Sequence, residues 1–241
     1  MESMDWSQIL ERYRHLSRGF QNKIQTIQKK VAKLDKGAEV DVISKDLEDL
    51  DSLFQEIDTW IYMSSLEDTD EVTRNHVPGD MSLKSKITRG KAKIKKAADY
   101  KNVKIDVEDV EDAHITTYLS FFEQLLSLLL GNALKYSAKS GDISVSSAKR
   151  DDVVSLSIYS YGPIVEFDEV DKLTEKGFRA RAAIASNMAG DGFGLYNAKR
   201  VCDMLRIKMT VKSEHAKATE INNVRYAQFV VRLLVPYNIY M

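Results

Sequence analysis

The chain has 241 residues, of which 44% are hydrophobic and 29% are charged, and its formal net charge is −1. This length holds one large domain or two modest ones, and the composition is typical of a globular protein in water. The near-neutral charge excludes a long-range attraction to nucleic acid or to an anionic membrane.

The N-terminus begins with M-E-S-M-D-W, which is acidic and shows no signal peptide. No apolar run approaches the roughly 20 residues that cross a bilayer. Cys202 is the only cysteine, so an intrachain disulfide is excluded and a reducing interior suits the chain. We therefore expect a cytoplasmic protein with no membrane partner.

Apolar side chains recur in steps of three and four along two stretches of the first 65 residues, the spacing of one helix face. The first stripe contains Leu10, Tyr13, Ser17, Phe20, Ile24, Ile27, Val31 and Leu34, and the second contains Ile43, Leu47, Leu50, Phe54, Ile57 and Ile61. Gly37 separates them, and Asp41 is a candidate N-cap for the second helix. The pattern predicts an antiparallel helical hairpin over residues 1–65.

A two-helix hairpin cannot bury both stripes by itself, whereas two copies can do so in a four-helix bundle. The alternative is a hairpin that packs on the C-terminal domain of its own chain. We expect a homodimer in which residues 1–65 form the dimerisation and phosphotransfer-like domain.

Residues 66–82 are predicted to be a linker, because they are acidic and contain the Pro78-Gly79 breaker. A basic helix follows, with the cations Lys84, Lys86, Arg89, Lys91, Lys93, Lys95 and Lys96. Such a cluster is either a nucleic-acid patch or a solvated helix face, and no aromatic residues interleave with it. We expect a solvated face and no nucleic-acid partner.

Strands and helices alternate in the remainder of the chain. Strands are expected at 103–107, 143–147, 153–159, 207–212 and 227–235, and helices at 115–137 and 195–205. The strands at 143–147 and 153–159 pair as a hairpin. This order predicts an α+β domain over residues 83–241, a sandwich of helices on a mixed sheet.

The long predicted helix contains the run L-L-L-G-N-A-L-K-Y-S at 128–137. Asn132 lies inside this apolar helix, where an amide costs free energy unless it has a partner. A magnesium ion and phosphate oxygens would supply that partner. Lys135 follows three residues later on nearly the same face and would place its ammonium on a phosphate.

Two glycine-containing segments accompany this helix. S-Y-G-P-I, at 160–164, comes directly after a predicted strand, and Gly162 would let the backbone approach a flat base. G-D-G-F-G-L, at 190–195, opens a helix, so that its amide N–H groups and the helix dipole form a phosphate cradle. Each segment alone is a weak signal, but the three in this order and spacing are a strong one.

The combination resembles the GHKL (Bergerat-fold) ATPases, and within them the catalytic domains of sensor histidine kinases. The resemblance implies that Asn132 holds magnesium against the triphosphate, that Lys135 contacts phosphate and that Tyr136 lines the nucleotide. Ser160 stands where the family usually has an aspartate that accepts from the adenine amino group, beside Gly162.

The resemblance also implies that the glycines of 190–195 wrap the phosphates, and that residues 175–189 form a mobile ATP lid in which Arg179 or Arg181 is a phosphate ligand. The complete set expected to bind ATP is Asn132, Lys135, Tyr136, Ser160, Gly162, Ile164, Arg179, Gly190, Gly192, Phe193, Gly194 and Leu195.

The chain departs from the family pattern at several positions. With Ser160 in place of aspartate, adenine binding is expected to weaken by about tenfold to a hundredfold. Leu128 occupies the place of a second asparagine or of a general-base glutamate, and it cannot activate water. Ile164 replaces a glycine and Thr174 a lid phenylalanine. We expect ATP and Mg²⁺ to bind, without fast hydrolysis.

The phosphoacceptor motif is also altered. R-G-F-Q-N-K-I, at 18–24, matches the kinase pattern with Arg18 in place of the histidine. Guanidinium stays protonated and cannot accept phosphate as an imidazole does. His15 is the nearest alternative, on an outward heptad position but without an acidic neighbour to orient its ring. His76 and His114 lie off the helix.

These observations favour a histidine kinase-like, ATP-binding signalling protein of the two-component type with weakened or lost autophosphorylation, acting as a homodimer and with a response-regulator-like protein as a possible partner. The first alternative is an active kinase that phosphorylates His15 or a histidine of a partner. The second is a non-enzymatic dimeric scaffold or phosphotransferase-like interaction protein with a vestigial nucleotide site.

Overall fold

The computed structural model describes residues 77–239, apart from 187, 189–191 and 222, and seven residues nearer the N-terminus. The seven are Phe20, Ile24, Thr26, Ile27, Val31, Ile43 and Leu50, and each is helical. The chain divides into two compact units, Met1–Asn75 and His76–Met241. The turn and pairing of the predicted hairpin lie outside the described residues, and so does His15.

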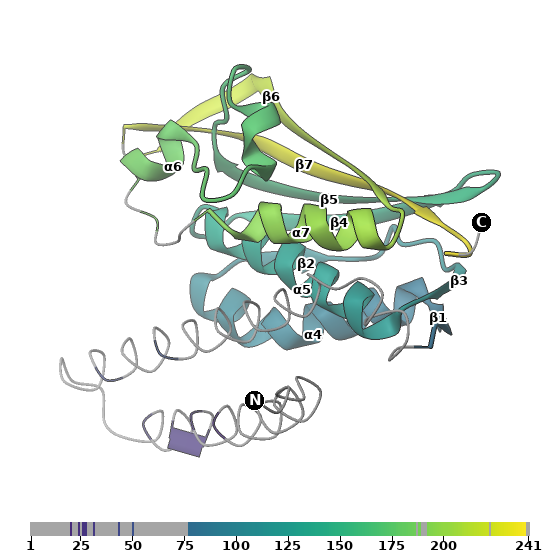
Figure 1. The fold of residues 1–241 in the computed structure, drawn as a ribbon. Helices are drawn as coiled ribbons and strands as arrows, with labels where there is room; N and C mark the ends of the chain where they lie inside the picture. Colours follow the sequence, from purple (N-terminus) through teal and green to yellow (C-terminus); the bar gives the residue numbers. More distant parts are fainter. Residues whose placement is uncertain are drawn as a thin grey trace, which may run out of the picture. The chain divides into compact units, whose positions relative to one another are not determined.

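The second unit is built on a five-stranded mixed sheet (Figure 1). Its strands are β2 (Lys104–Asp106), β4 (Asp142–Lys149), β5 (Val153–Pro163), β6 (Lys208–Ile221) and β7 (Val224–Pro236), in the order β2-β4-β5-β7-β6. β2 runs parallel to β4, and the other neighbours are antiparallel. The mixed sheet and the β4–β5 hairpin confirm the prediction.

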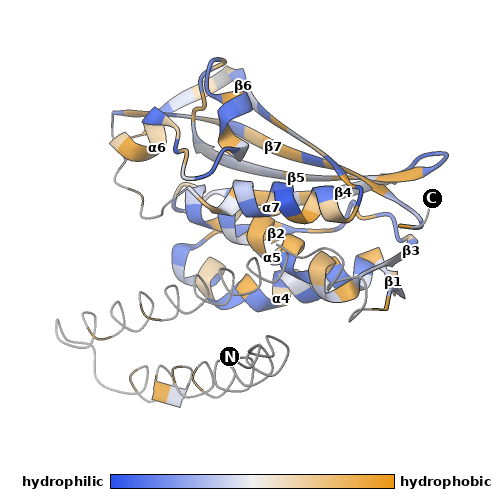
Figure 2. Ribbon diagram, viewed as in Figure 1, coloured by the Kyte–Doolittle hydropathy of each residue, from blue (hydrophilic) through white to orange (hydrophobic). Residues whose placement is uncertain are grey.

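Three helices lie on one side of this sheet: α4 (Leu83–Lys101), α5 (Leu119–Tyr136) and α7 (Gly194–Met204) (Figure 1). α5 packs against β5 and lies between the other two helices, both of which it contacts. Alternate residues of β5 are buried, among them Val154, Leu156 and Ile158, because side chains on a strand alternate between its faces. Figure 2 shows the corresponding apolar positions on α5 and along the strands. This is the predicted α+β sandwich.

The start of α5 corrects the prediction of a helix from residue 115. Residues His114–Thr117 form strand β3, which pairs antiparallel with β1 (Gly79–Ser82) in a separate two-stranded sheet. The helix begins only at Leu119. The pairing partner of β3 lies in the stretch assigned to the linker, so local periodicity did not reveal it.

The β6–β7 hairpin is longer than predicted, because β6 continues from the expected end near 212 to Ile221. Its added part is polar, and the register shifts between Glu214 and Thr219. As an edge strand, β6 needs no continuous apolar pattern. The hairpin reaches past the start of α7 toward α6 (Arg181–Ala185) (Figure 1).

The basic helix α4 begins with a polar cap. The Ser82 hydroxyl accepts from the amide of Ser85, and the Asp112 carboxylate accepts from the Ser82 hydroxyl and from the amide of Lys84. These hydrogen bonds hold the pKa of Asp112 below its usual value, with the Lys84 amide as the largest cause.

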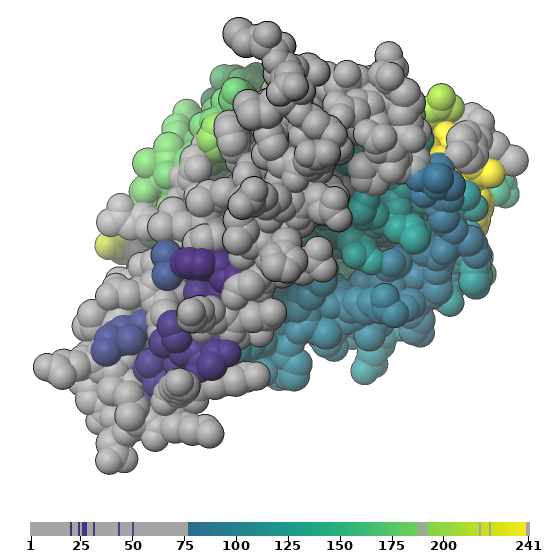
Figure 3. Space-filling model, turned by 60° about the horizontal axis from the view of Figure 1, so that its bottom comes forward, coloured from purple at the N-terminus to yellow at the C-terminus, as the bar shows by residue number. Residues whose placement is uncertain are grey.

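Figure 3 shows the outer surface to which α4 contributes. No helix among the described residues is both long and apolar enough to cross a membrane.

Candidate functional site

The side chain of Asn132, on α5, meets the first residue of α7. A Cβ added at Gly194 would lie 2.5 Å from both Nδ2 and Oδ1 of Asn132. The absence of a side chain at Gly194 is therefore what lets the amide reach the start of α7. Two segments that the sequence assigned to one site are brought together by the fold.

The other side of the glycine loop is covered by the lid. Gly192 has φ +77°, in the left-handed region, and a Cβ there would lie 2.5 Å from the Gly177 carbonyl carbon and the Phe178 oxygen. Gly177 itself has φ +76°. Backbone thus packs on backbone, which only glycine permits at this distance. Gly190, the first glycine of the loop, lies outside the described residues.

Arg179, in the lid, is half-buried. Its Nη2 donates a hydrogen bond to the Met188 carbonyl, while its Nε is buried without a partner. Within the described part of the chain, Asn132 Nδ2 and Arg179 Nε are the two buried side-chain polar atoms that make no hydrogen bond. Leaving such an atom unpaired costs about 1–3 kcal/mol. Both atoms are donors, so an anionic acceptor would satisfy them.

An apolar cluster packs lid residues against the rest of the domain. Its buried members are Val165, Leu173, Ala180 and Ala183, and partly buried Tyr136, Phe178 and Leu195 pack against them. The ammonium of Lys135 lies 5.7 Å from the centre of the Tyr136 ring. The predicted residues Tyr136 and Leu195 are therefore brought together, with lid residues packed onto the same cluster.

Ser160 and Gly162 lie inside β5, not after a strand, because β5 continues to Pro163. Ser160 is 6% exposed and has the same strand parity as the buried Leu156 and Ile158, so it is on the side of the helices. A Cβ at Gly162 would lie 3.2 Å from the Tyr136 carbonyl oxygen. Because Gly162 has no side chain, the end of α5 can pack close to β5. That Gly162 lies against a nucleotide base stays a prediction.

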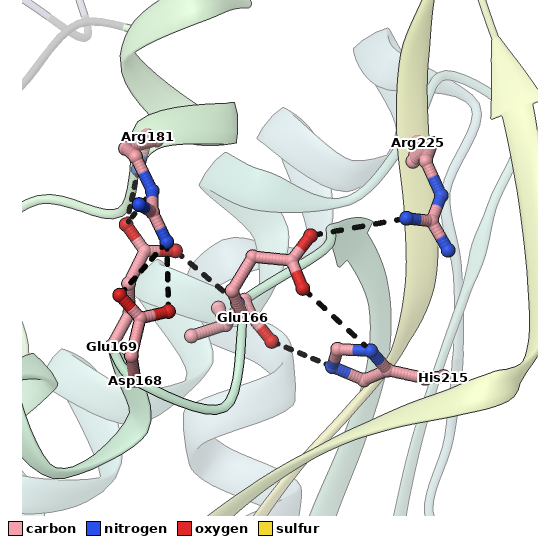
Figure 4. Close-up of polar contacts among 7 residues, drawn as sticks. Glu166, Asp168, Glu169, Arg181, His215 and Arg225 are labelled. Atoms are coloured by element: carbon pink, nitrogen blue, oxygen red, sulfur yellow. Dashed lines mark hydrogen bonds and ion pairs between the residues drawn. The ribbon is translucent and has the colours of Figure 1, made fainter.

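Three further predicted residues take different positions. Ile164 is buried, and its amide donates to the Arg225 carbonyl. Phe193 precedes α7 and is 38% exposed. Arg181, the alternative to Arg179, is engaged by the carboxylates of Asp168 and Glu169 (Figure 4). The guanidinium of Arg181 is thus already paired with carboxylates, whereas the Nε of Arg179 has no partner.

Residues 118–233 match the family model described as "Histidine kinase-, DNA gyrase B-, and HSP90-like ATPase". The matched region contains α5, the lid, the glycine loop and most of the sheet. Residues 118–233 thus match a GHKL ATPase domain.

Known sensor kinases resemble the GHKL domain and its surroundings. The sensor protein kinase GraS of Staphylococcus aureus is 28% identical over 166 residues, which is 68% of this chain and 46% of GraS. The chain thus spans about half the length of this curated relative.

Solved structures show the same fold. The nucleotide-free catalytic domain of histidine kinase ThkA superposes with a TM-score of 0.54 at 18% identity, covering 68% of this chain and 98% of that one. A structure of ThkA in complex with the response regulator protein TrrA gives a TM-score of 0.51 at 17% identity, over 97% of this chain and 62% of that one.

Two residues that the sequence did not single out support the site. Lys101, the last residue of α4, donates from Nζ to the carbonyls of Leu134 and Lys135 at 2.9 and 2.8 Å. Burial lowers its pKa. It closes the C-terminal end of the helix that carries Asn132. In the sequence Lys101 is one cation of a basic helix, and nothing local distinguishes it.

The second residue is Glu169, the one buried acidic side chain among the described residues, at 4% exposure. It lies between β5 and the 3-10 helix η2 (Val170–Thr174) and contacts the backbone of α6. Its neighbours in the sequence are also acidic, so no sequence signal separated it from exposed charges.

The two buried, unpaired donors Asn132 Nδ2 and Arg179 Nε are suited to an anionic acceptor. The described residues contain no group of three or more His, Cys, Asp and Glu side chains suited to a metal ion. Mg²⁺ commonly binds through few protein ligands together with substrate phosphates. The unpaired donors at Asn132 and Arg179 could meet such phosphates, and Oδ1 of Asn132 could hold the metal.

Proposed function

We propose that the chain is a histidine kinase-like, ATP-binding signalling protein of the two-component type, with weakened or lost autophosphorylation. The observation that carries this proposal is the pair of buried, unpaired donors, Asn132 Nδ2 and Arg179 Nε, beside the glycine loop of a GHKL domain. A phosphate chain would satisfy both donors at once.

In this proposal Asn132 and Lys135 hold the phosphates from α5, and Arg179 reaches them from the lid. Magnesium, bound with ATP through Oδ1 of Asn132, would neutralise part of the phosphate charge. Tyr136 and Leu195 offer apolar surface to the nucleoside, with Ser160, Gly162 and Ile164 on the β5 side.

The lid must move for the nucleotide to enter. The backbone of Gly177 and Phe178 lies so close to Gly192 that a Cβ on Gly192 would come within 2.5 Å of it. Phosphate bound along the glycine loop would compete with this contact. ATP would therefore displace the Gly177–Phe178 part of the lid, and a partner would read that change as a population shift.

Catalytic output is proposed to be reduced because two groups are missing from the sequence. Leu128 on α5 has no atom that can take a proton from water, and Arg18 stands in the phosphoacceptor position. His15 is the remaining candidate acceptor on the predicted first helix. The hairpin would make the homodimer, and ThkA, solved with a response regulator, suggests a response-regulator-like partner.

Calorimetric titration with Mg-ATP tests nucleotide binding. We expect the wild type to bind, and Asn132→Ala and Arg179→Ala each to weaken binding by about tenfold or more, the loss of a hydrogen bond to a charged group. Absence of wild-type binding at millimolar ATP would contradict the proposal and would favour the scaffold.

Incubation with γ-labelled ATP tests the catalytic part. We expect no acid-labile label on the wild type. A label that disappears in His15→Ala would instead establish an active kinase with His15 as its acceptor. If Asn132→Ala left the cellular activity unchanged, the nucleotide site would be vestigial.

A further inference from the structure

Glu169 joins the start of α6, in the lid, to the segment between β5 and η2 through one carboxylate (Figure 4). Its Oε1 accepts a hydrogen bond of 2.8 Å from the amide of Arg181 and lies 3.1 Å from the Nε of the same residue. Its Oε2 accepts from the amide of Glu166 at 3.2 Å. The carboxylate thus connects the end of β5, the start of η2 and the start of α6.

The start of α6 depends on this contact. Ala180 is the N-cap residue of α6 and has no side-chain acceptor, so the first amide of the helix needs a partner from elsewhere. Glu169 provides it. A helix of five residues is too short to hold its position through its own hydrogen bonds.

The segment held by Glu169 also carries Arg179. Arg179 precedes Arg181 by two residues, and Ala180 between them is buried in the apolar cluster. With Ala180 buried and Arg181 held by Glu169, the backbone on the C-terminal side of Arg179 is fixed. The side chain then keeps its buried Nε beside the Met188 segment that leads to the glycine loop.

We propose that Glu169 is a positioning residue, which holds the lid so that Arg179 meets the terminal phosphate of ATP. This role rests on the proposed nucleotide binding. The lid would then distinguish ATP from ADP, because ADP lacks the terminal phosphate that Arg179 meets. Glu169 acts through α6 and does not touch the nucleotide.

Asp168 provides a matched control. Its two carboxylate oxygens lie 2.7 and 3.0 Å from Nη2 of Arg181, the same guanidinium, but among the described residues Asp168 accepts no hydrogen bond from a backbone amide of α6. Its side chain is 63% exposed against 5% for Glu169. An exposed ion pair contributes little to stability. Glu169→Gln and Asp168→Asn therefore remove one charge each from the same cluster with different structural consequences.

The first measurement is amide hydrogen exchange of the nucleotide-free protein. In Glu169→Gln we expect amides within residues 178–186 to exchange about tenfold faster, and in Asp168→Asn to stay within about twofold of the wild type. Unchanged exchange in Glu169→Gln would overturn the inference. Exchange in β5 and α5 reports whether the variant keeps its fold.

The second measurement compares Mg-ATP and Mg-ADP affinity by calorimetry. We expect Glu169→Gln to weaken the binding of Mg-ATP about tenfold and the binding of Mg-ADP by less than about threefold. In an Arg179→Ala background, Glu169→Gln should weaken the binding of Mg-ATP by less than about a further twofold. Equal losses for ATP and ADP, or full additivity with Arg179→Ala, would show a merely structural role. If the wild type bound neither nucleotide, the proposed function and the phosphate role of Arg179 would fail, while exchange would still decide whether Glu169 holds α6.

Discussion

The amide of Asn132 lies against the backbone of Gly194, so closely that a Cβ on Gly194 would come within 2.5 Å of both of its terminal atoms. The contact joins the middle of the domain, α5, to the first residue of α7. It also fixes where the buried Nδ2 of Asn132 points, beside the glycine loop.

Gly194→Ala is therefore expected to displace the Asn132 side chain and to weaken Mg-ATP binding about as much as Asn132→Ala does. The effects of the two substitutions should not add, because both remove the same amide from the site. Calorimetry on the two single variants and the double variant measures this.

Gly131→Ala is the control, since a Cβ there meets nothing within 4 Å. It should leave binding intact and stabilise α5 by about 0.5–1 kcal/mol. Fully additive losses would argue against a shared site.

Ser160→Asp should restore the acceptor that the family usually places opposite the adenine amino group. Because Ser160 is buried, an unpaired carboxylate there is expected to lower the melting temperature of the nucleotide-free protein. ATP affinity should rise by about tenfold. Inosine triphosphate, which lacks the amino group, should gain nothing. A gain for both nucleotides would place the base elsewhere.

Lys101→Met should destabilise the domain by about 1–3 kcal/mol, because the carbonyls of Leu134 and Lys135 lose a charged donor. Urea unfolding monitored by circular dichroism measures the change in free energy. Lys93→Met, at an exposed position of the same helix, should change stability by less than about 0.5 kcal/mol. Equal effects of the two substitutions would mean that Lys101 does not secure the end of α5.

Cys202 should be inert in the folded protein. Its side chain is fully buried, and burial raises the pKa of the thiol to about 12, so little thiolate is present near neutral pH. We expect a thiol reagent to label it at least about tenfold more slowly than in denatured protein, at a rate set by opening of the structure. Rapid labelling of the native protein would show that α7 opens locally.

His114 should contribute to stability at low pH. Its Nδ1 lies 3.0 Å from Asp80 Oδ2, and that hydrogen bond raises the pKa of the ring above 6.5. A folded-state pKa above the unfolded one means that the stabilisation is present below about pH 6.5 and is lost as the pH rises through the folded value. Titration by NMR should show the raised pKa, and Asp80→Asn should return it toward the ordinary value. An unchanged pKa in that variant would exclude Asp80 as the cause.

Local patterns in the sequence predicted several parts of this domain correctly. The apolar helix around Asn132, the helix that follows the glycine loop and the β4–β5 hairpin are visible because periodicity and glycine placement are properties of neighbouring residues. Asn132 could be singled out because an amide inside an apolar helix needs a partner, wherever that partner comes from.

The contacts between distant segments were decided only by the tertiary structure. The pairing of β1 with β3, the packing of Gly192 on the lid, the engagement of Arg181 and the burial of Glu169 each join residues that have no local signature of one another. Burial depends on the segments that pack over a side chain. The sequence therefore does not distinguish the buried Glu169 from the nearby acidic residues Glu166 and Asp168. The sequence determined the kind of domain, because its signals are local; the fold decided which polar groups are buried, because burial depends on segments that are distant in the chain.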